Sequence, residues 1–288
     1  MEIFELRYFL EVAKYENIHR ASEKINVSPA ALSKAITRLE DELGVKLFSR
    51  EGRAIRLSSH GKVLQKRGSE IAQLEESARL EVSGHLGSIQ AVVAGPEILL
   101  SKWGLELSHQ IKIKYPLSTF EFHSTDDDHA LAQVVRGESH FAVVTTESIP
   151  SELTSKLVGE SVFQTCVGPK HPLYSFAKAK KTVPIEKVLE FPFVSPSHPL
   201  LGKVGLKQSI DGWRDDEFPR KVEYFTSSLK LLEELVTHGK SIAYLPDYYC
   251  KTLGLEILKV SGCPYTCKQK IRLVTRKNKE LGWINQIF

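Results

Sequence analysis

Residues 17–40 read NIHRASEKINVSPAALSKAITRLE, and this stretch decides how the N-terminal part of the chain folds. Apolar side chains such as Leu32 and Ile36 recur at helical spacing through its second half. In front of that half, Ser28 is a good N-cap because its hydroxyl can accept a backbone N–H, and Pro29 suits the first helical position. The stretch therefore predicts two helices joined by a tight turn.

These two predicted helices also carry side chains that can reach base edges and phosphates in DNA. An ordinary helical hairpin would show the same apolar pattern, so the stretch by itself leaves both interpretations open. As a helix-turn-helix, it would place its second helix in the major groove. The candidate DNA contacts are then His19, Arg20, Ser28, Pro29, Ala30, Ser33, Lys34, Thr37 and Arg38.

A basic hairpin is predicted directly after these helices. Residues 45–48 and 54–57 have the composition of two short strands, and residues 51–52 form the turn between them. A hairpin beside a helix-turn-helix makes a wing that rests on the phosphate backbone, a contact that positions a protein without specifying sequence. A solvated basic hairpin is the alternative. The candidate backbone contacts are Arg50, Arg53 and Arg56.

With the hairpin included, the chain resembles the LysR-type transcriptional regulators. The resemblance is carried by residues 6–13 (LRYFLEVA), 31–40 (ALSKAITRLE), 43–50 (LGVKLFSR) and 56–61 (RLSSHG). The family usually has Gln and then Pro at the start of the recognition helix, where this chain has Pro29 and Ala30. The resemblance implies a sequence-specific regulator that binds an interrupted near-palindrome in double-stranded DNA. It also implies a homodimer or homotetramer controlled by a small-molecule effector.

The composition fits a protein of two or three domains. The chain has 288 residues and a mild net charge of +4, and its basic residues crowd the region 46–67, as a nucleic-acid footprint requires. No apolar run approaches the ~20 residues of a membrane span, and the N-terminus leads at once into an amphipathic helix. We therefore expect a soluble, cytoplasmic protein without a signal peptide. Its four scattered cysteines are expected to be free thiols.

A long helix is predicted next, from residue 59 to about residue 83, capped by Ser58 and ended by Gly84. At ~1.5 Å per residue it would be on the order of 37 Å long. Leu64, Ile71 and Ala78 recur every seven residues and form a short coiled-coil seam. Packing on its own domain is the alternative. We favour dimerisation, because an isolated rod has no other way to bury that stripe and LysR-type proteins pair through this helix.

From residue 88 onward, short β-branched runs alternate with helical patterns, which indicates an α/β domain with a parallel sheet. The alternation predicts two halves with a cleft between them. The predicted linking stretches lie near residues 148–159 and 263–270, and one helix is predicted near residues 201–212.

These segments together predict an α+β multidomain protein with three parts. They are a winged helix-turn-helix domain (1–58), a linker and dimerisation helix (59–86), and an α/β effector domain similar to periplasmic binding proteins (87–288). The effector domain would divide into subdomain I (87–160 and 266–288) and subdomain II (161–265).

The candidate effector contacts lie in the loops after strands, because ligands of open α/β sheets bind at the carboxyl ends of strands. Each hydroxyl in these loops could instead be a simple helix N-cap. Many family members carry Ser or Thr where this chain has Pro96 and Glu97, and Glu97 would repel a carboxylate. We therefore expect a neutral, cationic or largely apolar effector, or none. The predicted contacts are Pro96, Glu97, Ile98, Ser124, Thr125, Thr145, Ser197 and Thr226.

Metal binding and catalysis are not expected. Residues 123–129 (HSTDDDH) would be poorly preorganised as ligands, and Cys263 and Cys267 lack the two-residue spacing of common zinc motifs, so no metal or cofactor is predicted. The chain has no nucleophile elbow, Walker loop, dinucleotide fingerprint or His-Glu-x-x-His pair, which favours a regulator over an enzyme. The alternative function is a DNA-binding architectural protein whose α/β part only oligomerises.

Overall fold

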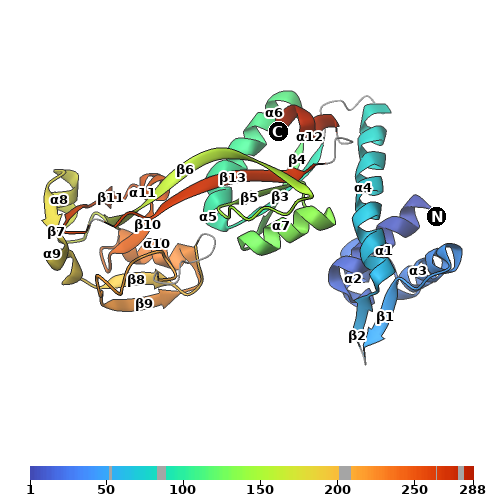
Figure 1. Cartoon of the computed structure of the whole chain (residues 1–288), viewed down its shortest axis with the longest axis horizontal. Coiled ribbons are helices and arrows are strands. Elements are labelled where there is room, and N and C mark those ends of the chain that lie inside the picture. The colour runs from blue at the N-terminus through green and yellow to red at the C-terminus, as the bar shows by residue number, and fades with distance from the viewer. Residues whose placement is uncertain (52–53, 83–88, 201–208, 264, 278–281) are drawn as a thin grey trace.

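The computed structural model describes residues 1–51, 54–82, 89–200, 209–263, 265–277 and 282–288. Figure 1 shows a helical unit with a small hairpin at one end, the long helix α4 beside it, and an elongated α/β part that extends away from both. Gly52 and Arg53 lie outside the described residues, and so part of the predicted turn and one predicted phosphate contact do too. None of the described helices is both long and apolar enough to cross a bilayer.

The N-terminal unit consists of three helices and a two-stranded hairpin. Its elements are α1 (Ile3–Tyr15), α2 (Ile18–Ile25), α3 (Pro29–Leu43), β1 (Phe48–Glu51) and β2 (Ala54–Leu57). Side chains from α1, α3 and the segment before β1 form its buried core, which includes Leu6, Phe9, Leu39 and Leu47.

Side-chain caps fix where the two helices of the motif begin. The carboxamide oxygen of Asn17 accepts the backbone N–H three residues on at 3.0 Å, and the Ser28 hydroxyl does the same at 3.2 Å. Gly44, with a φ of +67°, lies directly after α3 and ends it. The predicted turn and the predicted helix start at Pro29 are therefore confirmed.

The first strand of the hairpin begins at Phe48, later than the predicted residue 45. The reason is Glu40 in α3, whose carboxylate accepts the backbone N–H groups of Leu47 at 2.8 Å and Phe48 at 3.3 Å. The Val45 N–H donates to the Glu40 carbonyl at 3.2 Å. These bonds hold residues 45–47 against the helix and keep them out of the strand pairing.

The predicted linker helix is α4 (Ser59–Val82), and Ser58 caps it by accepting the Gly61 N–H at 3.0 Å. Its first turns pack on the N-terminal unit. Leu64 joins the core around Leu6, and a Cβ on Gly68 would lie 2.6 Å from the Leu6 Cδ1. Leu64 is thus partly buried against its own unit, and its place in a coiled-coil seam stays a prediction.

The C-terminal part is built on a seven-stranded sheet of order β10-β6-β13-β5-β3-β4, with β11 paired to β6. Its β3, β4 and β5 are parallel to one another, whereas β6, β13 and β10 pair antiparallel. The strands are β3 (Gln90–Gly95), β4 (Thr119–Ser124), β5 (Phe141–Val144), β6 (Leu153–Val167), β10 (Ala243–Pro246), β11 (Glu256–Ile257) and β13 (Lys268–Arg276).

Two long strands join the halves of this part (Figure 1). β6 and β13 pair from Leu153 opposite Arg276 to Val162 opposite Lys268. The predicted linking stretches 148–159 and 263–270 do lie where the chain passes between the halves, and they run into strand from Leu153 and from Lys268. Much of β6 is only partly buried, so its sequence reads as polar linker although its backbone is paired along its length.

Helices and short strands cover this sheet and complete the second half. Two small parallel sheets, β8–β9 and β7–β12, lie in that half. The remaining elements are α5 (Glu97–Leu99), η1 (Leu100–Gly104), α6 (Leu105–Lys114), α7 (Asp127–Arg136), α8 (Tyr174–Lys178), β7 (Thr182–Pro184), α9 (Ile185–Leu189), β8 (Phe193–Pro196), β9 (Val222–Thr226), α10 (Leu229–Thr237), α11 (Asp247–Thr252), β12 (Lys259–Ser261) and α12 (Gly282–Ile287).

The prediction of a helix near residues 201–212 is wrong at residues 209–212, which are the part of this range that the structure describes. Residues 201–208 lie outside the described part of the chain. Beyond them, Ser209 and Gly212 form a turn in which the Gly212 N–H donates to the Ser209 carbonyl at 2.7 Å, with a φ of +84° at Gly212. The left-handed backbone at Gly212 ends any helical run at this point.

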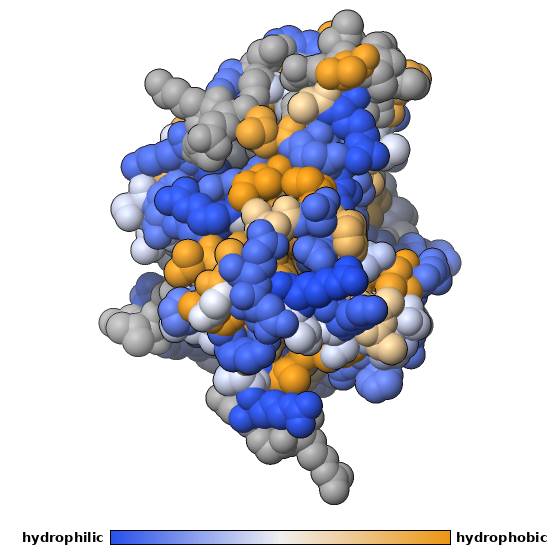
Figure 2. All heavy atoms as spheres, turned by 90° about the vertical axis from the view of Figure 1, so that its right-hand side faces the viewer, coloured by the Kyte–Doolittle hydropathy of each residue, from blue (hydrophilic) through white to orange (hydrophobic). Residues whose placement is uncertain are grey.

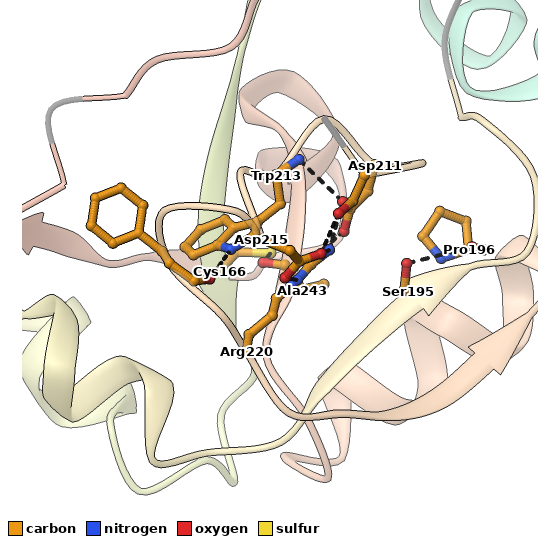
Figure 3. Close-up of polar contacts among 10 residues, drawn as sticks. Cys166, Ser195, Pro196, Asp211, Trp213, Asp215, Arg220 and Ala243 are labelled. Atoms are coloured by element: carbon orange, nitrogen blue, oxygen red, sulfur yellow. Dashed lines mark hydrogen bonds and ion pairs between the residues drawn. The ribbon is translucent and has the colours of Figure 1, made fainter. Parts of the chain in front are cut away.

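A buried ion cluster anchors the segment that follows this turn. Arg220 donates two hydrogen bonds to Asp211, at 2.7 and 2.8 Å, and a third to Asp215 at 3.1 Å, as Figure 3 shows. The Arg220 and Asp211 side chains are each only 1% exposed. The guanidinium also lies 5.3 Å from the ring centroids of Phe193 and Trp213. Residues 209–221 are thus fixed to the core of the second half by charge pairing and aromatic packing.

Candidate DNA-binding surface and effector cleft

The outer face of α3 is built for recognition. Its inner face buries Leu32, Ile36 and Leu39, so the helical period turns the predicted contact residues outward. Ser33, Lys34, Thr37 and Arg38 are all exposed. The Thr37 hydroxyl donates back to the Ser33 carbonyl at 3.0 Å, whereas Lys34 and Arg38 form no ion pair with any described residue. Two cationic side chains therefore stand free on this face.

A shallow hollow of about 680 Å³ lies beside the N-terminus of α3. The predicted contacts His19, Pro29, Ala30 and Ser33 line it, together with Ile55 of the hairpin. Its apolar floor offers methyl and ring carbons to a base edge, where an alanine methyl can contact the thymine methyl.

Two other predicted contacts have structural partners. The Ser28 hydroxyl is occupied as the α3 cap, so it holds the helix rather than standing free. The Arg20 guanidinium lies 4.9 Å from the Tyr15 ring centroid, which places it on the first helix of the unit while its side chain remains exposed.

Two basic side chains in and beside the hairpin are paired with carboxylates, so the hairpin has fewer free positive charges than its sequence suggests. Arg56 pairs with Glu16, whose carboxylate also accepts the Leu57 N–H at 2.9 Å. Although burial opposes ionisation, these bonds lower the pKa of Glu16. Lys46 pairs with Glu40 at 2.7 Å. Arg50 is exposed and forms no ion pair with any described residue, so its guanidinium is available for a phosphate contact.

A cleft of about 500 Å³ lies between the two halves of the C-terminal part. It is lined by segments that follow β3, β4, β8 and β9, as expected for ligands at the carboxyl ends of strands. Six of the predicted effector residues line it: Pro96, Glu97, Ile98, Ser124, Thr125 and Thr226. Asp126, Pro196, Ser227 and Ser228, in the same predicted loops, also line it. The lining residues that the sequence did not single out are His198, Pro199, Leu200, Leu229 and Leu232.

Thr145 and Ser197 do not line this cleft. Thr145 is buried, and its hydroxyl and backbone N–H both donate to the Asp127 carboxylate at 2.9 Å. Thr145 therefore holds the start of α7 rather than a ligand. Ser197 donates its backbone N–H to the Thr226 carbonyl at 2.8 Å, and its neighbours Pro196 and His198 line the cleft instead.

Several polar groups of the cleft are already used by the fold. The Ser228 hydroxyl caps α10 by accepting the Leu231 N–H at 3.2 Å, and Thr226 accepts the Ser228 N–H at 2.9 Å. Asp126 caps α7 by accepting the His129 N–H at 2.9 Å. Capping residues can be identified from the sequence, but the fold determines which of them line the same cleft.

The charged residues among the described lining of the cleft are acidic. They are Glu97 and Asp126, and no lysine or arginine is among the described lining residues. The N-termini of α7 and α10 add partial positive charge, which favours polar groups with lone pairs over a full anion already opposed by two carboxylates. The arrangement suits a neutral or cationic guest.

Sequence comparisons agree with this geometry. The family model described as bacterial regulatory helix-turn-helix protein, LysR family, matches residues 3–62, and the LysR substrate-binding domain matches residues 87–282. The second match alone covers more than half of the chain. The chain therefore belongs to the LysR family of transcriptional regulators.

Similar proteins are regulators of transcription. The HTH-type transcriptional regulator BsdA of Bacillus subtilis is 34% identical over 154 residues, which is 53% of each chain. The transcriptional dual regulator GltC of the same organism is 26% identical over 288 residues, 98% of this chain and 93% of that protein. Both are described as regulators rather than enzymes.

Solved structures share the fold along the whole chain. Full-length OxyR from Pseudomonas aeruginosa superposes with a TM-score of 0.63 at 18% identity, covering 100% of this chain and 93% of that one. CbnR in complex with its target DNA superposes with a TM-score of 0.58 at 17% identity, covering 100% and 97%. Identities this low show the fold alone.

Proposed function

We propose that this protein is a sequence-specific DNA-binding regulator whose binding to DNA is controlled by a small neutral or cationic effector. The observation that carries the proposal is the exposed face of α3, with Lys34 and Arg38 standing free beside the hollow at Ala30. We assign DNA binding to residues 1–58, the linker to 59–86 and effector binding to 87–288, with subdomain I at 87–160 and 266–288 and subdomain II at 161–265.

Base readout is assigned to the first turns of α3. Ser33 and Lys34 can donate to base edges, and Ala30 can contact a thymine methyl. Arg50 and Arg53 would contact the phosphate backbone. Arg56 would position the hairpin through Glu16 as well as contributing charge.

Pairing of two copies would occur through α4. Apolar side chains are exposed along it, with Val63 65%, Ile71 38% and Leu74 47% exposed, and Figure 2 shows apolar residues among charged ones on this end of the molecule. Such a stripe is what a second helix of the same kind would bury. A paired α4 would present two recognition helices to two half-sites.

Exposed apolar side chains on both subdomains support a tetramer. Ile113 (81% exposed) and Leu117 (65%) lie on subdomain I, while Phe225 (69%) and Leu231 (51%) lie on subdomain II. In a two-fold pairing, the apolar residues on subdomain I of each copy can contact those on subdomain II of the other copy. Together with α4 this gives two distinct contacts, as a dimer of dimers requires.

Control by the effector would pass through α7. The loop at its N-terminus lines the cleft, and its C-terminal Gly137 packs so closely on α4 that a Cβ there would lie 2.5 Å from the Ser69 Cβ. Next to it, the Gln65 Nε2 lies 3.4 Å from the Glu138 Oε1. One rigid helix therefore touches both the cleft and the linker, so a change in cleft closure would shift α4.

Footprinting on the region upstream of the protein's own gene tests DNA binding. We expect two protected half-sites separated by about one helical turn or a multiple of it, and steep weakening with salt as counterions are released. No protection at low salt on any promoter fragment would contradict the proposal.

Calorimetry with a panel of small acids and amines tests the effector class. We expect amines or neutral molecules to bind and Thr125→Ala or Thr226→Ala to weaken them. Tight binding of a simple dicarboxylate, unchanged in both variants, would contradict the ligand class and the site.

A further inference from the structure

Three helices begin at the effector cleft, and they differ in the charge of their first turns. α5 and α7 lie in one half of the C-terminal part, and α10 lies in the other (Figure 1). The first turn of α5 carries Glu97, and α7 is capped by Asp126, with two more aspartates directly after it. All of α10 is described, and its first turn carries no acidic residue. The two walls of the cleft therefore differ in the charge that they present to a guest.

On the wall formed by subdomain I, Glu97 is the carboxylate most available to a ligand. It is exposed, lines the cleft and forms no ion pair with any described residue. Asp126 is more engaged, because its two oxygens contact the backbone N–H and the ring Nδ1 of His129 at 2.9 and 2.7 Å. Ionised carboxylates accept hydrogen bonds and donate none, so this wall attracts an ammonium group and repels an anion.

On the wall formed by subdomain II, the N-terminus of α10 offers hydrogen-bond donors instead. The Ser228 N–H donates to the Thr226 hydroxyl at 2.9 Å, and the Leu231 N–H donates to the Ser228 hydroxyl at 3.2 Å. The N–H groups of Leu229 and Lys230 lie between these two, where no preceding turn supplies a helical carbonyl. Together with the dipole of this nine-residue helix, they favour a carboxylate.

The cleft itself shows that these two walls face a ligand. Its volume is about 500 Å³, and it lies in the part of the chain that matches the LysR substrate-binding domain. His198, the other ionisable residue among its described lining, lies on the α10 side and is never negatively charged. Apolar side chains such as Ile98, Leu200 and Leu232 line the cleft as well and favour a hydrocarbon group in the guest.

We propose that the effector is a zwitterion of the amino-acid class with an apolar side chain. Its ammonium lies at Glu97, and its carboxylate lies at the N-terminus of α10. A simple anion is repelled by the acidic wall, and a simple amine leaves the donors of α10 unpaired. A zwitterion satisfies both walls and favours closure of the two halves around it. This assignment rests on the proposed function, because it concerns the same cleft.

Thermal-shift and calorimetric titration of the full-length protein with each of the common amino acids tests this ligand class. We expect at least one amino acid with an apolar side chain to raise the melting temperature and to bind one site per chain. Its N-acetyl derivative lacks the ammonium and its carboxamide lacks the carboxylate, so each should bind at least about tenfold weaker. No binding by any amino acid, or equal binding by either derivative, would overturn the proposal.

A variant of Glu97 locates the ammonium group. Glu97→Gln removes the charge at nearly constant shape and should weaken binding of the amino acid about tenfold, without weakening binding of the N-acetyl derivative. Glu106→Gln is the matched control, because Glu106 is exposed on α6 and lies outside the cleft lining, and it should bind as the parent does. Undiminished binding by Glu97→Gln would overturn the placement of the ammonium.

A pair of variants at Ser227 locates the carboxylate. Ser227→Asp places a negative charge beside the donors of α10 and should weaken binding at least about a hundredfold. The same charge complements the helix dipole, so the melting temperature without ligand should not fall. Ser227→Asn has nearly the same shape without the charge and should retain binding. Equal binding by the two variants would overturn the placement of the carboxylate at α10.

Failure of this proposal and failure of the proposed function give different results. An amine that binds in the cleft and changes the DNA footprint without needing a carboxylate would overturn the zwitterion and leave control by an effector in place. An amino acid that binds as described without changing the footprint would contradict control of DNA binding and leave the ligand class in place.

Discussion

The DNA-binding surface and the effector cleft differ in how their side chains are brought together. On the surface, nearly all contacts come from one continuous stretch, residues 19–56, and Lys34, Arg38 and Arg50 stand free of ion pairs with described residues. In the cleft, four segments meet that are far apart in the chain, and Thr226 and Ser228 also cap or brace the fold. Apart from Ser28 and Arg56, the side chains of the first region can change without disturbing the structure, whereas several in the second cannot.

The largest expected effect is on the buried Arg220–Asp211 cluster in the same half as two of the cleft segments. Arg220→Ala leaves Asp211 buried without its partner and should lower the free energy of unfolding by about 3–5 kcal/mol. Arg38→Ala, on the exposed face of α3, should change it by less than about 0.5 kcal/mol. Urea unfolding of both variants measures the difference. Equal losses would break the distinction between the two regions.

Pairing through α4 should be the next largest effect. Leu74→Asp places a charge on the exposed stripe, and loss of one buried leucine is worth about 1.5–3 kcal/mol per helix. We expect monomers in analytical ultracentrifugation and at least tenfold weaker DNA binding, with unfolding of the single chain unchanged. If the variant still formed dimers and bound DNA as tightly as the parent, the pairing surface would lie elsewhere.

Acid should affect the effector half more than the DNA-binding unit. Burial, with a contribution from Arg276, lowers the pKa of His140 to about 3, against about 6.5 in an unfolded chain. The unfolded chain therefore takes up the proton first, so the stabilisation is complete above pH 6.5 and is lost as pH falls toward 3. From pH 7.5 to 5 the titration of His140 alone should lower the free energy of unfolding by about 2 kcal/mol.

Variants separate this contribution from other acid effects. His140→Gln should remove most of that decrease in pH-dependent unfolding, while His109→Gln, at an exposed position, should retain it. An unchanged pH profile in His140→Gln would contradict the assignment.

The smallest effect distinguishes two neighbouring serines of the cleft. Ser228→Ala removes the α10 cap and should lower the free energy of unfolding by about 1 kcal/mol, whereas Ser227→Ala should be neutral. Thermal unfolding of the pair measures the difference. A neutral Ser228→Ala would mean that the cleft hydroxyls are as independent of the fold as the side chains on α3.

Local signals in the sequence were sufficient for the DNA-binding unit. Ser28, Pro29 and the period of Leu32 and Ile36 determine α3, because caps and burial act within a few residues. The error at residues 45–47 came from Glu40, whose carboxylate reaches forward to two backbone N–H groups. Nothing in the composition of residues 45–48 reveals that contact.

The sequence predicted only those cleft residues that lie at or directly after the ends of predicted strands. Six of its residues followed from that rule, yet Thr145 faces Asp127 and Ser197 is one residue out of phase with the lining positions. The face on which a loop residue points depends on register and on partners distant in sequence. For the same reason β6, partly exposed and polar, reads as a linker although it pairs with β13.

The claim that α3 makes the base-specific contacts is tested most directly by comparing the operator preference of two variants. Lys34→Ala and Arg50→Ala are each measured by gel shift against an operator selected by the parent protein and against its single-base variants. Lys34→Ala should change the order of preference at one position, by about 1–3 kcal/mol, while Arg50→Ala should weaken all sequences about equally. Uniform weakening by both variants, or no change in either, would contradict the assignment of base readout to α3.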